Sequence, residues 1–131
     1  MSAYARWLFG AAAAANLLVA ASMSIGQAGF VAILALDPIA GTNAVLVDLS
    51  AVLIAFFGYG YARVALDPAR FRPLIAIGAW GKLAAVGTVL VGALTLPHLW
   101  RLLALISGDV AFAALFLDYL RRTSTPGRTA A

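Results

Sequence analysis

Three polar side chains lie deep inside long apolar runs of the sequence: Asn16, Lys82 and Asp109. Lys82 is the only lysine in the chain, and the other eight basic residues are arginine. An ammonium or carboxylate that is withdrawn from water is costly unless it gains a partner of opposite charge or loses its own charge. These residue types therefore predict an ion pair between Lys82 and Asp109, with Asn16 as a hydrogen-bonding neighbour.

The depth of the three residues strengthens this prediction. A helix rises about 1.5 Å per residue, which places Lys82, Asp109 and Asn16 about 14, 16 and 15 Å from the same side of the membrane, the side expected to face the cytoplasm. Two interpretations of the trio are open. In one, the ion pair only fixes how the helices pack, and in the other the trio is a ligand-binding or proton-handling site. We find no catalytic motif and assign no catalytic residue.

The composition excludes several other kinds of site. The chain has no cysteine, which excludes disulfides and cysteine-type zinc sites, and its one histidine excludes a haem held by two histidines of this chain. We therefore predict no metal site and no resident cofactor. The formal net charge of +4 does not indicate nucleic acid binding, because the arginines lie at the ends of apolar runs, as membrane topology requires.

The apolar content indicates whether the chain is surrounded by water or by lipid. Hydrophobic residues make up 64% of the 131 residues and charged residues 11%, whereas soluble domains average about 45–50% and about 25%. A chain this small cannot bury so much apolar surface in water, so we expect a lipid bilayer around it.

Four apolar runs are long enough to span a bilayer, which takes about 20 residues each. Pro73 and Pro97 are favourable first-turn residues for the last two runs. The sequence therefore predicts an all-α membrane protein, an up-and-down antiparallel four-helix bundle, with helices at about 7–26, 42–66, 73–96 and 97–120.

The connections define the rest of the organisation. We expect one transmembrane domain over residues 1–122 and a flexible cytoplasmic tail over 123–131. The short connections predict that the second helix packs against the third and the third against the fourth. Residues 27–41 are too apolar for a free loop. They either extend the first helix or form a short helix in the outer membrane interface.

The arginines set the expected orientation. Those on one side are Arg6, Arg63, Arg70, Arg72, Arg121, Arg122 and Arg128, whereas Arg101 is the one arginine expected on the other side. The positive-inside rule then predicts a multi-pass protein of the bacterial cytoplasmic (inner) membrane with both termini in the cytoplasm. We expect Arg63, Arg70, Arg72, Arg121 and Arg122 to contact anionic lipid headgroups.

Two further groups of residues are expected at the membrane interfaces. On the outer side, Asp48 is either a headgroup-level residue or one wall of an outward pocket with Gln27, His98 and Arg101. On the cytoplasmic side, an aromatic belt is expected to contain Tyr4, Trp7, Tyr61 and Tyr119. Small residues within the helices, such as Gly81 and Gly108, predict close helix packing or a face for a partner.

The stretch GYGYARVALDPARFRPLIAIGAWGK, residues 58–82, resembles small bacterial four-helix membrane proteins of the DoxX-like type. Ala15-Asn16-Leu17-Leu18 and Gly108-Asp109 resemble two further motifs of that family, although Gly108 stands where the family has asparagine, so a paired-amide role is not expected there. The resemblance implies the same bundle, with Asn16, Lys82 and Asp109 at the family's polar positions. It also implies a quinone-linked redox subunit as one alternative function.

Three functional hypotheses follow. The first is a non-enzymatic accessory subunit that binds other membrane protein subunits or a second copy of itself. The second is a pocket at the membrane midplane for a bound lipid, a quinone, or a sterol-like or isoprenoid molecule. The third is a small exporter, which ranks last because the first helix carries Asn16 where small multidrug transporters use glutamate.

Overall fold

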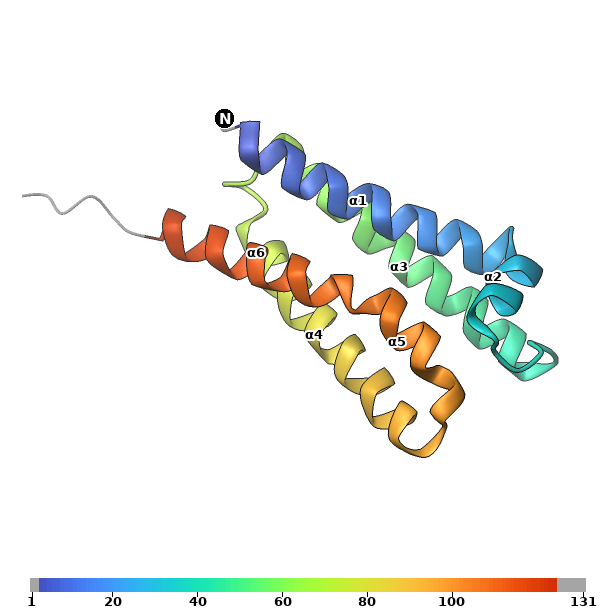
Figure 1. The fold of residues 1–131 in the computed structure, drawn as a ribbon. Helices are drawn as coiled ribbons and strands as arrows, with labels where there is room; N and C mark the ends of the chain where they lie inside the picture. Colours follow the sequence, from blue (N-terminus) through green and yellow to red (C-terminus); the bar gives the residue numbers. More distant parts are fainter. Residues whose placement is uncertain (1–2, 125–131) are drawn as a thin grey trace, which may run out of the picture.

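The computed structural model describes residues 3–124, and this part of the chain is helical with no strand. In chain order the elements are α1 (Ala3–Ser24), α2 (Gln27–Leu34), α3 (Thr42–Leu66), α4 (Arg72–Thr95), the 3-10 turn η1 (Pro97–Leu99), α5 (Trp100–Ile106) and α6 (Gly108–Thr123) (Figure 1). Within the described part, four segments are long and apolar enough to cross a membrane: α1, α3, α4 and the η1–α6 stretch. The predicted all-α four-helix architecture is confirmed. The expected tail beyond Ser124 lies outside the described residues.

Two of the predicted helix boundaries are close to those observed. α3 has the predicted bounds, and α4 begins and ends one residue earlier than predicted. α1 begins earlier than predicted and ends at Ser24, because the amides of Ile25 and Gly26 both turn back to the carbonyl of Ala21, at 2.8 and 3.2 Å. Residues 27–34 therefore form the separate short helix α2, and the alternative of a longer first helix is wrong.

The predicted fourth spanning segment is present at Pro97–Thr123, but it is not one uninterrupted α-helix. The helix is interrupted at Ser107, whose hydroxyl donates a hydrogen bond to the carbonyl of Ala104 at 2.7 Å. The amide of Val110 then bonds to the carbonyl of Ser107, three residues back, at 3.0 Å. Side chains that compete for backbone carbonyls bend helices in this way, and the glycine at position 108 weakens the helix further. Asp109 consequently lies in the first turn of α6.

The helices form two antiparallel pairs, α1 with α3 and α4 with α6 (Figure 1). Small side chains allow α1 and α3 to approach closely, since Ala12, Ala13 and Ala51 are buried there. Gly58 is the tightest point of this pair, because a Cβ at that position would lie 3.0 Å from Cγ of Leu17. The expected close packing of α3 against α4 is limited to the ends that they share, where Gly60 meets Leu74.

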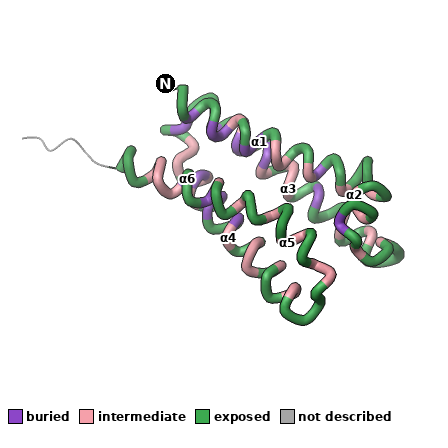
Figure 2. The backbone as a smooth tube through the Cα atoms, viewed as in Figure 1, coloured by how far each residue is buried: buried purple, intermediate pink, exposed green. Residues whose placement is uncertain are grey.

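The hydrophobic core lies at one end of the bundle. Its largest fully buried side chains are Phe9, Tyr61, Val64, Ile75 and Phe116. Figure 2 shows most of the buried residues gathered toward the end that carries the N-terminus. Aromatic rings join α1, α3 and α6 there, with ring centroids of Phe9 and Phe116 4.9 Å apart and those of Tyr61 and Phe116 5.2 Å apart.

At the opposite end the two pairs separate (Figure 1). They remain connected there through α2 and the chain that follows it. Arg101 on α5 donates a hydrogen bond to the carbonyl of Ile33 on α2 at 3.1 Å. His98 lies 3.8 Å from the carboxylate of Asp37. The fold is therefore closed by a core at one end and bridged by polar contacts at the other, with space between the two helix pairs.

Candidate functional site

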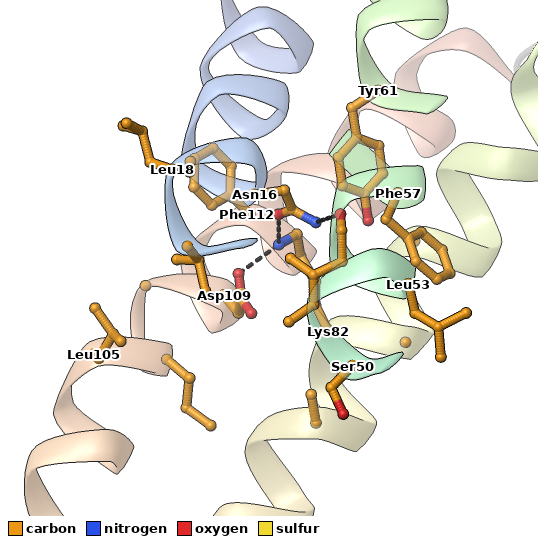
Figure 3. Close-up of a pocket in the computed structure, with 18 residues that line it drawn as sticks. Asn16, Leu18, Ser50, Leu53, Phe57, Tyr61, Lys82, Leu105, Asp109 and Phe112 are labelled. Carbon is orange, nitrogen blue, oxygen red and sulfur yellow. Dashed lines mark hydrogen bonds and ion pairs between the residues drawn. The ribbon is translucent and has the colours of Figure 1, made fainter. Parts of the chain in front are cut away.

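Lys82 is the centre of the polar site, and three helices meet at its ammonium group. Its Nζ donates a hydrogen bond to Oδ1 of Asp109 at 2.5 Å and another to Oδ1 of Asn16 at 3.1 Å (Figure 3). The side chain of Lys82 is 6% exposed and that of Asp109 is 29% exposed. The structure thus brings together the three residues that the sequence placed at one depth, on α4, α6 and α1.

Asn16 extends the network to the fourth long helix. Its Nδ2 donates a hydrogen bond to the carbonyl of Ile54 on α3 at 3.3 Å, while its Oδ1 accepts the bond from Lys82. A Cβ at Gly58 would lie 3.2 Å from Cβ of Asn16. Glycine at position 58 therefore lets α3 approach closely enough for the amide of Asn16 to span the two helices.

The break at Ser107 in the last long apolar segment positions Asp109. Because α6 begins at Gly108, the carboxylate of Asp109 lies at the positive end of a helix dipole as well as beside Lys82. A negative charge is stabilised at that end of a helix. The ammonium and the carboxylate carry opposite charges, so the pair of Lys82 and Asp109 is neutral overall.

Two aromatic rings enclose the ammonium group on the side of the core. The Nζ of Lys82 lies 5.5 Å from the ring centroid of Tyr61 and 5.4 Å from that of Phe112. Both distances allow a cation–π attraction. The expected place of Tyr61 in an interfacial aromatic belt is wrong, because its side chain is 1% exposed and belongs to the core. Tyr4 and Trp7, by contrast, are exposed.

A cavity of about 600 Å³ lies between the two helix pairs and ends at this network. Its lining is mainly apolar, and its charged residues are Lys82 and Asp109 (Figure 3). The residues that line it are Ala15, Asn16, Leu18, Val19, Ser50, Leu53, Ile54, Phe57, Tyr61, Gly78, Gly81, Lys82, Ala85, Leu105, Ile106, Gly108, Asp109 and Phe112. An apolar cavity with a few convergent polar groups is the usual form of a small-molecule site. Hereafter we call it the central cleft.

The glycines of the central cleft correct one expectation. A Cβ at Gly81 or Gly108 would meet no atom within 4 Å, so neither residue is a point of close helix packing. Both line the central cleft instead. The tight packing positions are Gly58, Gly60 and Gly78, and at Gly78 an added Cβ would lie 2.6 Å from the hydroxyl of Tyr61.

The predicted outward pocket of four polar residues does not form. Asp48 is exposed on α3, and within the described residues no hydrogen bond or ion pair joins it to the other three. Gln27 bonds to the carbonyl of Met23 in the preceding helix at 3.3 Å. His98 and Arg101 contact α2 and its following chain, as described above, and none of the four residues lines the central cleft. Gln27, His98 and Arg101 thus form separate contacts, and Asp48 is exposed apart from them.

The five arginines that were expected to contact lipid headgroups also divide by role. Arg72 caps α6, because its guanidinium donates to the carbonyl of Leu120 at 2.6 Å and to the hydroxyls of Thr123 and Ser124. Arg122 pairs with Asp118 at 2.7 Å. The remaining three are exposed, and two of them, Arg63 and Arg70, each lie 5.6 Å from the ring of Phe71.

Tyr61, Phe112 and Gly58 are the site residues that sequence reasoning missed. Helical spacing could have indicated Phe112, since it follows Asp109 by three positions and so faces the same side of α6. Within the described residues, no cluster of histidine, aspartate or glutamate could hold a metal ion. No protein-family model, curated protein or solved structure matches the chain.

Proposed function

We propose that the protein binds an apolar, membrane-derived molecule in the central cleft, with Lys82, Asp109 and Asn16 at the polar end of the site. The cavity beside the ion pair carries this proposal. A pair that only held helices together would be expected to be packed on every side, because protein interiors contain few voids larger than a water molecule. Here the pair borders a space of about 600 Å³, within the range of small-molecule sites.

The energetics favour the same function. Insertion scales give about 2.5–3.5 kcal/mol for each charged residue at a helix centre, and a packed apolar pair would avoid that cost. Ionisable groups inside membrane segments are for this reason usually tied to a binding or transport pathway. Quinones, sterol-like molecules and isoprenoids share the required shape, which is a long apolar body with a small polar end.

The proposed setting is the bacterial cytoplasmic membrane, with both termini in the cytoplasm. The clustering of Arg63, Arg70, Arg72, Arg121 and Arg122 at one end of the fold supports this orientation through the positive-inside rule. The aromatic core then lies in the cytoplasmic half of the membrane, and the wide end of the central cleft lies in the outer half.

The test is the native mass of the protein after extraction in a mild detergent. We expect the 13.6 kDa chain to carry one small lipophilic molecule. Gly81→Leu should remove it, because the new side chain would enter the central cleft where a Cβ meets nothing within 4 Å. Gly87→Leu is the matched control, since this glycine is equally uncrowded on α4 but is not part of the cleft. Equal occupancy in both variants would contradict the proposal.

A second candidate function is that of a non-enzymatic accessory subunit, bound to other membrane proteins or to a second copy of this chain. One observation favours it: Ala14 and Ala21 are exposed on α1, and a Cβ at Gly10 would meet nothing. Small exposed residues at helical spacing suit close contact with another membrane helix. The same extraction distinguishes the two functions, because co-migrating polypeptides in place of a small molecule would favour the accessory subunit.

A further inference from the structure

The polar end of the central cleft has hydrogen-bonding capacity that the protein itself does not use. Tyr61 is the clearest case. Its side chain is 1% exposed, yet its hydroxyl forms no hydrogen bond within the described residues. The side chain lines the cleft, and Figure 3 shows the hydroxyl pointing toward the space that Phe57 and Lys82 also face. A buried phenol usually has a partner for its O–H group.

Lys82 and Asp109 each have capacity left as well. The ammonium group has three N–H donors, of which Asp109 and Asn16 accept two. The carboxylate accepts the bond from Lys82 at one oxygen, Oδ1, and its side chain remains 29% exposed. The end of the cleft therefore offers two unused donors, the Tyr61 hydroxyl and one Lys82 N–H, and one unused acceptor, the second oxygen of Asp109.

The charge balance restricts what this end can accept. Lys82 and Asp109 cancel each other, and the rest of the lining carries no charge. A ligand with a carboxylate head would place a second negative charge beside Asp109, and one with an ammonium head would place a second positive charge beside Lys82. Either repulsion is strong where water is scarce. A neutral head meets neither penalty.

From the free donors, the free acceptor and the charge balance, we infer that the ligand is a neutral lipid whose polar head is a hydroxyl group. A hydroxyl is the smallest neutral group that both accepts and donates. Its oxygen accepts a hydrogen bond from Tyr61 or Lys82, and its proton is donated to Asp109. The hydrocarbon body extends along the apolar walls, past residues such as Leu53 and Leu105. This inference rests on the proposed ligand-binding function and names the chemical class of the ligand.

The experiment uses four matched photoreactive probes and the full chain in phosphatidylcholine vesicles. Each probe is a hexadecyl chain with a mid-chain diazirine, and the heads are a hydroxyl, a carboxylate, an ammonium and a methyl group. The peptides that become labelled identify the site. Competition by the same molecules without the diazirine ranks the four heads by affinity. We expect labelling on the walls of the central cleft, with the alcohol competing at least tenfold better than the other three.

Tyr61→Phe supplies the residue-level test. It removes the hydroxyl and no hydrogen bond within the protein, so the fold should persist. Loss of one neutral hydrogen bond should weaken competition by the alcohol about threefold to tenfold and leave the methyl-headed probe unchanged. Tyr59→Phe is the matched control, because Tyr59 is exposed on the same helix and is not part of the cleft. Tyr59→Phe should leave competition by the alcohol and by the methyl-headed probe unchanged.

The outcomes separate the two proposals. Cleft labelling that is equal for all heads, or strongest for the acid or the amine, would overturn the hydroxyl inference and leave the ligand-binding function standing. Absence of cleft labelling by every probe would overturn both. Cross-links from the cleft to a second copy or to another polypeptide would show that a helix occupies the space, which would also overturn both.

Discussion

Replacing Lys82 by methionine removes one ammonium group from the network and leaves a side chain of similar length. The carboxylate of Asp109 would then have no cationic partner, and Oδ1 of Asn16 would lose its donor. Replacing Asp109 by leucine is the complementary change. It leaves the ammonium of Lys82 with only the amide of Asn16 and two aromatic rings around it.

The exposed fractions of the two side chains give the expected magnitudes. Breaking a buried ion pair from one side costs about 3–5 kcal/mol, because the remaining charge is left without compensation. Lys82 is 6% exposed and Asp109 29%, so the charge left by Asp109→Leu is the more deeply buried one. We expect about 5 kcal/mol for Asp109→Leu and about 3 kcal/mol for Lys82→Met, both as losses in the free energy of unfolding.

The double variant Lys82→Met/Asp109→Leu should be far less destabilised than the sum of the two single changes. Replacement of a buried pair by apolar side chains of similar volume is often neutral or stabilising by about 1–4 kcal/mol. The double-mutant cycle therefore predicts a coupling free energy of several kcal/mol between the two positions.

The assay is reversible unfolding in mixed detergent micelles, followed by helical circular dichroism for the four proteins of the cycle. Additive losses, with the double variant near 8 kcal/mol below the wild type, would refute the reasoning that the charges compensate each other. If Asp109→Leu lowered the free energy of unfolding less than Lys82→Met, the ranking by exposed fraction would be refuted. Ligand binding should be lost in the double variant even though its fold persists, which separates the site from its structural role.

Three further predictions follow from other parts of the structure. Gly58→Ala should lower the free energy of unfolding by about 1–3 kcal/mol, because its Cβ would crowd Leu17 and Asn16 on α1; Gly81→Ala, which crowds nothing, is the control in the same unfolding assay. Arg101→Met should widen the distance between spin labels on α2 and α5, because it removes the hydrogen bond to the carbonyl of Ile33. An unchanged distance would mean that this contact does not hold the wide end together. Arg72→Met should speed hydrogen exchange of the amides in the last turn of α6, because the guanidinium caps that helix end. Unchanged exchange rates would refute the capping role.

The sequence predicted the long helices well because their signals are local and strong. Apolar runs of spanning length, together with start signals such as Pro73, place α3 and α4 to within one residue. The trio was also predictable, because buried charges need partners and a common depth leaves few choices. Asn16, Lys82 and Asp109 met that condition on three separate helices.

Other features depend on packing that a single sequence does not encode locally. The separation of the two helix pairs depends on where the large aromatic residues pack, which is the end of the bundle that carries the N-terminus, as at Phe9 and Phe116. Tyr61 has the sequence position of an interfacial aromatic, whereas in the structure it is buried against Phe116 and Gly78. The break at Ser107 depends on a side-chain bond to a carbonyl of the same helix, which serines in membrane helices form with or without a break.

The most direct test of the central claim is an electron-density map of the wild-type protein crystallised from a lipid phase. The account predicts an elongated molecule of non-protein density in the central cleft, between the α1–α3 and α4–α6 pairs, with its polar end within hydrogen-bond distance of Lys82, Asp109 or Tyr61. A closed cleft, in which the side chains of Leu53 and Leu105 meet and no such density remains, would contradict it.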